Sequence, residues 1–197
     1  MKNEFKIIAN LLPPRSRVLD VGCGDGTLIQ ALINEKNIDT RGIELGKDNV
    51  KKCISKGLSV IEGNAETELH QFPNKAFDFV ILSQTLQAFY QPENVLNELL
   101  RIGKKVIISI PNFGYWQVRT SLLFFGKMPV TKSLPDSWYN TPNLHVCSVK
   151  DFYQFCSKKK IKMNQIIGIN NERTSSINKI NLEMKNLLCE VGIFLIS

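Results

Sequence analysis

Short apolar runs alternate along this chain with stretches of helical periodicity, and this alternation is the feature that most restricts its fold. The runs, rich in β-branched residues, lie at 18–21, 40–44, 58–62, 77–82 and 105–110. Strands that alternate with helices form a parallel sheet, because each parallel connection needs a long crossover. The run at 77–82, FDFVIL, is apolar apart from Asp78, as expected for a strand covered on both faces. The sequence therefore predicts an α/β fold with a mostly parallel sheet.

The intervening segments predict the helices and complete the sheet. Helices are expected at 25–35, 47–56, 92–102 and 117–125, and Ser148 with Asp151 forms a capping box that begins another. Two further apolar runs, 161–169 and 191–196, bring the expected sheet to seven strands with helices on both faces. Neither a repeat nor a linker divides the sequence, so residues 1–197 are predicted to form a single domain.

A glycine-rich turn, VLDVGCGDGT at 18–27, follows the first run. Its spacing is G-x-G-x-G, whereas the dinucleotide fingerprint G-x-G-x-x-G would place a glycine at Thr27. Glycines let the backbone bend sharply and approach a ligand closely. Acidic Asp20 and Asp25 flank the turn and suit a ligand with a cationic end better than a pyrophosphate, which binds at a helix N-terminus.

Composition excludes several classes of function. The net charge is +7, but the basic residues are dispersed, and nucleic-acid binding needs them clustered. No apolar run reaches the roughly 20 residues of a membrane span, and the N-terminal segment lacks the features of a signal peptide. The five cysteines include no C-x-x-C pair, so no metal site is predicted. We expect a cytoplasmic protein with neither nucleic acid nor membrane as a partner.

The turn, together with the acid that ends the second run, resembles the class I methyltransferase fold, whose ligand is S-adenosylmethionine. The resemblance implies that Asp20 supports the ammonium group and that Glu44 grips both ribose hydroxyls. Asn64 stands where such enzymes commonly have an aspartate facing the adenine amino group, and its amide oxygen can still accept that hydrogen bond. The residues expected to bind S-adenosylmethionine or S-adenosylhomocysteine are Asp20, Gly22, Cys23, Gly24, Asp25, Gly26, Glu44, Asn64, Ala65, Ser83 and Gln84.

Longer motifs narrow the resemblance. SQTLQ at 83–87, PNFGYW at 111–116, KMPVTKSLP at 127–135 and WYNTPNLHVCSVKDF at 138–152 resemble the MetW family of methionine biosynthesis proteins. That family is associated with the homoserine O-acyltransferase MetX, so the resemblance implies MetX as a partner whose activity or assembly the protein supports. The association does not itself establish a methyl-transfer reaction.

The sequence leaves the chemistry open between two functions. Signatures of nucleic-acid methyltransferases are missing, since no N/D-P-P-Y/F loop follows the fourth run and no Pro-Cys dipeptide occurs. For a small-molecule methyltransferase, His145 is the candidate general base, with Tyr139 behind it. A lone histidine is also commonly a structural hydrogen-bonding group. A third alternative is a scaffold that has lost its cofactor.

The segment 111–147 is rich in aromatic residues and interrupted by prolines, and it is longer than a plain connection in a compact domain. Such insertions are usually lids, pockets or interfaces. Aromatic side chains interleaved with Arg119, Lys127 and Lys132 are typical of interface anchors. An acceptor pocket and a partner surface are both consistent with this segment.

Overall fold

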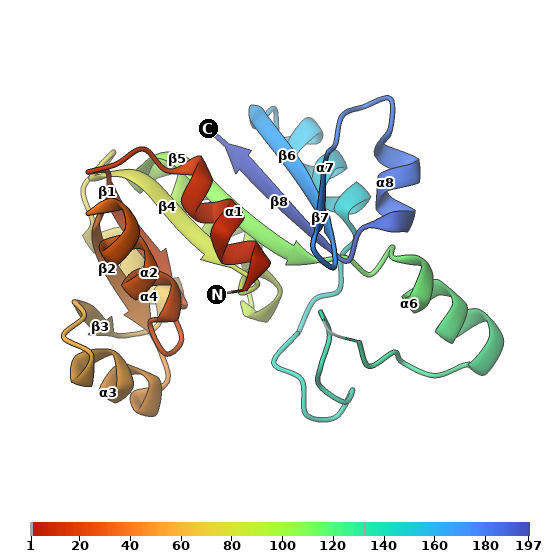
Figure 1. Cartoon of the computed structure of the whole chain (residues 1–197), viewed down its shortest axis with the longest axis horizontal. Helices are drawn as coiled ribbons and strands as arrows, with labels where there is room; N and C mark the ends of the chain where they lie inside the picture. Colours follow the sequence, from red (N-terminus) through yellow and green to blue (C-terminus); the bar gives the residue numbers. More distant parts are fainter. Residues whose placement is uncertain (1, 132) are drawn as a thin grey trace.

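The computed structural model describes residues 2–131 and 133–197, and its centre is a single mixed sheet (Figure 1). Across the sheet the strand order is β3-β2-β1-β4-β5-β8-β6-β7. The strands are β1 (Arg17–Val21), β2 (Asp39–Glu44), β3 (Val60–Glu62), β4 (Phe77–Ser83), β5 (Gly103–Pro111), β6 (Met163–Asn170), β7 (Arg173–Ser176) and β8 (Val191–Ile196). The α/β fold with a mostly parallel sheet is confirmed.

The parallel part of the sheet creates a place for a ligand. β1 pairs with β2 on one side and β4 on the other, so that Val18 lies opposite both Thr40 and Phe79. From β1 the chain moves outward through β2 and β3, then returns to the other side for β4 and β5. Ligands of open α/β sheets bind at the carboxyl ends of the strands where the order reverses in this way. In this chain the reversal lies between β1 and β4.

The remaining strands, β6, β7 and β8, pair in antiparallel fashion and bring the sheet to eight strands. β8 inserts between β5 and β6 and runs antiparallel to both. The expected count of seven was wrong, because β7 forms an additional edge strand paired with β6, from Ile167↔Ser176 to Asn170↔Arg173. The sequence of β7 is RTSS, which has no apolar residue and therefore gives no hydrophobic signal.

Helices cover both faces, as expected. The α-helices are α1 (Asn3–Leu11), α2 (Thr27–Lys36), α3 (Lys47–Ser55), α4 (Ala65–Glu68), α5 (Pro92–Ile102), α6 (Trp116–Thr120), α7 (Val149–Lys158) and α8 (Leu182–Leu188). Ile8 of α1 and Leu32 of α2 belong to one buried cluster with Ile81 of β4. Leu99 of α5 and Phe152 of α7 belong to a second cluster on the other face. α1, α4 and α8 were not predicted from the sequence.

The long insertion leaves the sheet after β5 and returns at α7. Asn112, which is 1% exposed, ties the two ends together: its Oδ1 accepts hydrogen bonds from the backbone N–H groups of Gly114 at 2.9 Å and Val149 at 3.0 Å. The expected helix at 117–125 forms as α6 followed by a π-helical turn, η3 (Ser121–Phe125), which ends at left-handed Gly126. This arm projects away from the sheet (Figure 1).

The predicted start of α7 can be seen in its hydrogen bonds. The capping box of α7 is confirmed, since the Ser148 hydroxyl accepts from Asp151 N at 3.1 Å and Asp151 accepts from Ser148 N at 2.8 Å.

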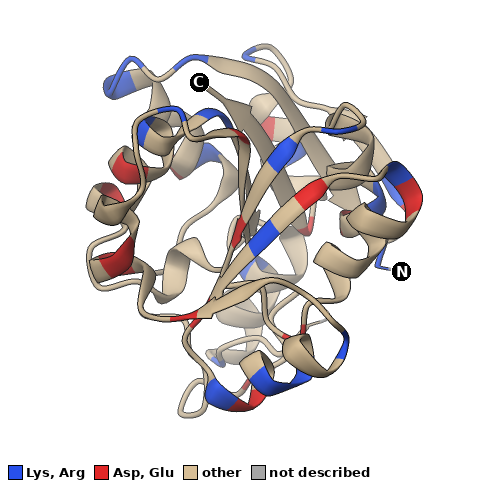
Figure 2. Cartoon of the chain, turned by 90° about the vertical axis from the view of Figure 1, so that its left-hand side faces the viewer, with Lys and Arg blue, Asp and Glu red and all other residues tan. Residues whose placement is uncertain are grey.

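No helix in the described part of the chain is long and apolar enough to cross a membrane. Basic and acidic residues are interspersed on the side of the molecule in Figure 2.

Candidate functional site: a glycine-lined cavity beside an open cleft

The glycine turn connects the end of β1 to the start of α2 and closes against β2. The N–H groups of Gly22 and Cys23 both donate to the carbonyl of Ile43, at 2.8 and 3.2 Å. A Cβ on Gly22 would lie 2.7 Å from the Thr85 methyl carbon, whereas a Cβ on Gly24 would meet nothing within 4 Å. All three glycines of the turn have positive φ, including +56° at Gly24. The turn therefore needs glycine for its backbone and leaves open space beside Gly24.

Glu44 ends β2 and lies against this turn. Its Oε2 accepts a hydrogen bond from Gly24 N at 2.8 Å, and its Oε1 accepts from Gly46 N at 2.8 Å. Backbone donors thus hold the carboxylate in one orientation at the carboxyl edge of the sheet. Each carboxylate oxygen can accept more than one hydrogen bond, so the group retains capacity for a ligand.

Asp20 lies beneath the turn with an unsatisfied oxygen. Its residue surface is 2% exposed, and its Oδ1 is buried with no hydrogen-bond partner among residues 2–131 and 133–197. Burial, reinforced by the charges of Glu44 and Glu4, raises the pKa of Asp20 to about 7. Buried polar groups are normally paired, and an exception needs an explanation such as a missing ion or ligand.

Glu4 was not predicted as a site residue, yet it is part of this site. It is 7% exposed on α1, and its Oε1 accepts from the Ser83 hydroxyl at 2.8 Å and also from the Ser109 hydroxyl. The side-chain amide of Gln84 donates to its Oε2. Ser83, Gln84 and Ser109 lie 79, 80 and 105 positions from Glu4 in the chain. Only an unpredicted N-terminal helix brings them together, so the hydrophobic pattern gave no signal for this contact.

Most of the predicted ligand-binding residues line one cavity of about 200 Å³. They are Asp20, Gly22, Cys23, Gly24, Asp25, Ser83 and Gln84, joined by Lys2, Glu4, Phe5 and Leu28. We call this the loop cavity. Gly26 lies behind it, where a Cβ would come within 2.4 Å of Leu58. Burial raises the pKa of the Cys23 thiol, so this cysteine is not an activated nucleophile.

Asn64 and Ala65 lie apart from the loop cavity. They line a neighbouring cavity of about 310 Å³ beside α4 and the start of α5. The Oδ1 of Asn64 accepts from Glu66 N at 3.0 Å and thereby caps α4. The predicted role of Asn64 toward an adenine amino group therefore stays a prediction, and any ligand would have to share this oxygen with the cap.

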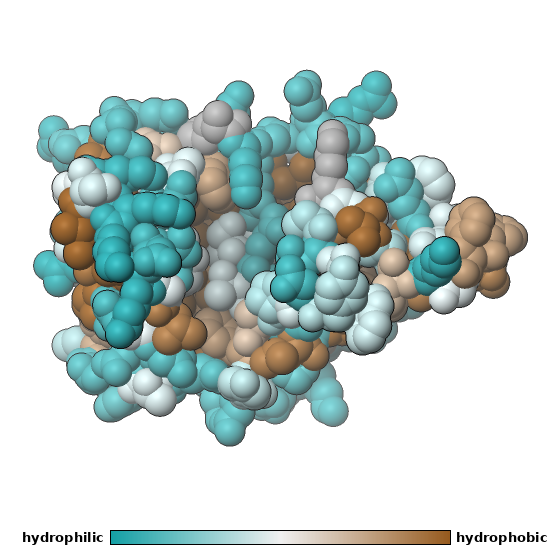
Figure 3. Space-filling view, turned by 90° about the horizontal axis from the view of Figure 1, so that it is seen from below, coloured by the Kyte–Doolittle hydropathy of each residue, from teal (hydrophilic) through white to brown (hydrophobic). Residues whose placement is uncertain are grey.

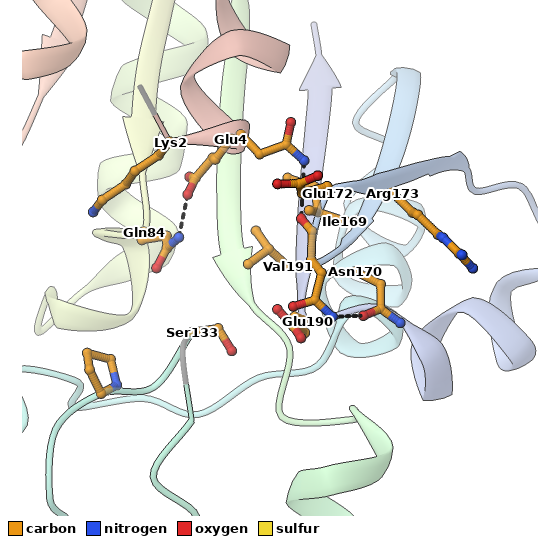
Figure 4. A pocket seen from close by; sticks show the side chains of 13 residues that line it. Lys2, Glu4, Gln84, Ser133, Ile169, Asn170, Glu172, Arg173, Glu190 and Val191 are labelled. Carbon is orange, nitrogen blue, oxygen red and sulfur yellow. Dashed lines mark hydrogen bonds between the residues drawn. The ribbon is translucent and has the colours of Figure 1, made fainter.

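A larger cleft of about 1000 Å³ adjoins the loop cavity (Figure 4). Lys2, Glu4 and Gln84 line both spaces and so form their common boundary. The opposite wall comes from the β6–β7 hairpin and the start of β8, and includes Arg173 and Glu190. Ser133 and Pro135 of the insertion complete the lining, so part of segment 111–147 faces this cleft. We call it the boundary cleft.

The two candidate catalytic residues lie elsewhere. His145 is exposed, its backbone N–H donates to the carbonyl of Gln87 at 2.9 Å, and it lines an apolar cavity of about 310 Å³ between α5 and α7. Tyr139 is 75% exposed and packs edge-on against Trp138. Their assignment to catalysis stays a prediction that no contact with the loop cavity supports. Lys132, predicted as an interface anchor, lies outside the described residues.

The projecting arm exposes apolar side chains. Those exposed by 46% to 75% are Leu122, Leu123, Phe124, Phe125, Met128 and Val130. We call this set the apolar arm, and Figure 3 shows apolar residues at the projecting end of the molecule. Contiguous exposed apolar patches on soluble proteins commonly mark interaction surfaces. The described ranges contain no group of three or more side chains arranged to hold a metal ion.

Comparison with solved structures defines the class of this fold. An S-adenosylmethionine-dependent methyltransferase from Thermotoga maritima, described as a possible histamine N-methyltransferase, superposes with a TM-score of 0.70 at 16% identity, covering 98% of this chain and 87% of that one. A second such methyltransferase, from Archaeoglobus fulgidus, gives a TM-score of 0.67 at 18% identity, covering 98% and 94%. The chain has the Rossmann-like fold of this class.

Sequence comparison then gives the family. The model for methionine biosynthesis protein MetW matches residues 2–196, and the chain belongs to the MetW family. A bifunctional methionine biosynthesis protein MetXA/MetW from Rhodopirellula baltica is 35% identical over 153 residues, which are 73% of this chain and 25% of that protein. The chain thus spans about a quarter of the length of that relative, which is a single polypeptide described as both MetXA and MetW.

Proposed function

We propose that the loop cavity binds S-adenosylmethionine. Asp20 supplies a buried carboxyl group whose Oδ1 has no hydrogen-bond partner in the described part of the chain, which suits the ammonium group of the ligand. Glu44 offers an oriented carboxylate for the ribose hydroxyls, and the open space beside Gly24 leaves room for the ligand to approach the backbone. When bound, the ligand would supply a sulfonium-activated methyl group. The likeness to methyltransferase structures supports this choice.

We further propose that the protein supports the homoserine O-acyltransferase MetX by binding it through the apolar arm. The observation that carries this proposal is the MetXA/MetW relative, in which the two functions are covalently joined. Two domains on one polypeptide are held at a high effective concentration, and the apolar arm is a set of unburied side chains available for a contact between them. Burial of large aromatic side chains is the usual source of interface energy.

Ligand occupancy would then connect the end of methionine metabolism to an early step. S-adenosylmethionine is made from methionine. A protein that binds both this ligand and the acyltransferase can therefore make the activity of the acyltransferase depend on the concentration of S-adenosylmethionine. Such coupling requires the ligand to change the affinity for the acyltransferase, by a free energy of typically about 1–3 kcal/mol. Equal acyltransferase binding with and without the ligand would refute this regulatory part alone.

The partner proposal is tested by mixing the purified chain with a homoserine O-acyltransferase and measuring complex formation by size-exclusion chromatography with light scattering. Replacing Phe124 and Phe125 by serine should abolish the complex. The matched control is Ile54→Ser on α3, which is 61% exposed and lies outside the arm. No complex with the unaltered chain would refute the partnership, whereas unchanged binding of the double variant would refute only the surface.

The second candidate function is a small-molecule methyltransferase, and the boundary cleft is the observation that favours it. The cleft meets the loop cavity at Glu4 and Gln84, so an acceptor there would lie next to the ligand. Its charged lining, with Arg173, Glu172 and Glu190, suits a polar acceptor. Transfer of radiolabelled methyl groups to a small molecule of a cell extract would support this function. If the protein binds S-adenosylmethionine but transfers no methyl group, the result would count against it.

A further inference from the structure

Glu4 is a buried acid for which the fold supplies neutral donors. Its hydrogen bonds come from two hydroxyls and one amide, those of Ser83, Ser109 and Gln84. Lys2 lines the same spaces, but its ammonium lies over the ring of Phe5 at 5.6 Å from the centroid. A buried carboxylate is costly unless a charge or several hydrogen bonds compensate it. The arrangement fixes the Glu4 carboxylate and leaves its charge available.

A second acid faces the same space independently. Asp20 also lines the loop cavity, and its buried Oδ1 has no hydrogen-bond partner among the residues that the structure describes. Two acids of like charge raise each other's free energy in a low-dielectric site, and Glu4 is one of the charges that raise the pKa of Asp20. A ligand with a single cationic group would relieve only part of this repulsion. A ligand with two separate cationic groups would match both acids.

The position of Glu4 indicates which cationic group it would meet. Asp20, near the carboxyl end of β1, lines the loop cavity only, whereas Glu4 lies on the boundary that the loop cavity shares with the boundary cleft. Figure 4 shows the side chains of Glu4 and Gln84 hydrogen-bonded to each other in the lining of the boundary cleft. In a ligand that presents a methyl group to such a cleft, the sulfonium is the cationic atom nearest the boundary. The ammonium group is then left for Asp20.

We propose that Glu4 recognises the sulfonium charge, so that the site distinguishes the charged methyl donor from its neutral product. This inference rests on the proposed binding of S-adenosylmethionine in the loop cavity. S-adenosylhomocysteine carries the same ammonium, ribose and adenine but a neutral thioether sulfur. Asp20 and Glu44 therefore contact groups common to both ligands, and Glu4 alone meets the difference. Occupancy of the site then follows the concentration of S-adenosylmethionine and depends little on that of S-adenosylhomocysteine.

The test is calorimetric measurement of Kd for three probes with the full chain. The probes are S-adenosylmethionine, S-adenosylhomocysteine and sinefungin, in which an amine-bearing carbon replaces the sulfonium. The unaltered chain should bind the two cationic probes at least about tenfold more tightly than the neutral one. Glu4→Gln, which preserves the side-chain shape, should lose about tenfold for both cationic probes and less than about twofold for the neutral one.

Two control variants separate charge recognition from structure. Glu35→Gln removes the same charge from an exposed position on α2 and should leave all three Kd values unchanged. Glu4→Asp keeps the charge and should retain the preference for the cationic probes. Equal weakening of all three probes by Glu4→Gln would show a structural role and overturn the inference. Should that variant not fold, a preference below about threefold in the unaltered chain would overturn it equally.

The outcome for the proposed function is read separately. If the unaltered chain binds none of the three probes, the proposed cofactor is wrong and the role of Glu4 falls with it. If it binds all three with equal affinity, the cofactor site stands and only the role of Glu4 is refuted.

Discussion

Replacing Asp20 by asparagine should stabilise the ligand-free protein while weakening its ligand binding. Burial raises the pKa of Asp20 from its usual 3.8 to about 7. Since each pKa unit corresponds to about 1.4 kcal/mol, ionised Asp20 costs the folded state on the order of 4 kcal/mol at pH 8. The new amide introduces buried donors that cost about 1–2 kcal/mol. A net gain of about 2–3 kcal/mol remains, or about 5–10 °C in Tm for a domain of this size.

The dependence on pH identifies the cause. Below pH 3.8 the side chain is protonated in both the folded and unfolded states, so ionisation costs nothing. As the pH rises toward 7, the unfolded state releases its proton first and the folded protein loses stability; above pH 7 the loss is constant. The advantage of the asparagine variant should therefore be larger at pH 8 than at pH 5. Differential scanning fluorimetry of both proteins across this range measures it.

A matched variant in the same turn should behave oppositely. Hydrogen bonds from Thr27 lower the pKa of Asp25, which is exposed, so its charge stabilises the folded state and that stability is lost as the pH falls. Asp25→Asn should thus lower Tm at pH 8 and converge with the unaltered protein in acid. The reasoning on Asp20 fails if Asp20→Asn shifts Tm equally at pH 5 and pH 8, or if S-adenosylmethionine binds to it as tightly as before.

Substitutions at three further places test the backbone strain of the glycine turn, the hydrogen bonds of Asn112 and the cap of α7. Gly24→Ala should cost only the strain of its positive φ, about 1 kcal/mol, whereas Gly22→Ala should cost more because its Cβ would meet Thr85; urea midpoints that rank them in reverse would contradict the packing. Asn112→Ala should destabilise by about 2–4 kcal/mol because it leaves buried backbone groups at both ends of the insertion unpaired, and increased proteolysis within 111–147 should accompany the loss. Ser148→Ala removes the cap of α7 and should cost about 1 kcal/mol in chemical denaturation, with Ser148→Asp restoring most of it.

Local patterns in the sequence were enough to predict the parallel half of the fold and the glycine turn. Strands such as β4 are recognisable because a strand covered on both faces is mostly apolar, as the run Phe79–Leu82 is. The helix start at Ser148 is recognisable because a cap requires particular side chains within a few positions. Spacing alone separated the G-x-G-x-G turn from a dinucleotide fingerprint. The long motifs of the insertion indicated the MetW family, which the family comparison confirmed.

Tertiary structure decided which side chains meet and what their charges cost. Glu4 reaches Ser83 and Ser109 only because α1 packs across the sheet, and no local pattern records contacts across 79 and 105 positions. The pKa of Asp20 depends on burial and on two acids from other elements, so the sequence could give its identity but not its charge state. Likewise, the polar strand β7 exists only because β6 offers an edge to pair with. Electrostatic energy depends on distance in space and on the surrounding dielectric, and only the folded chain sets either.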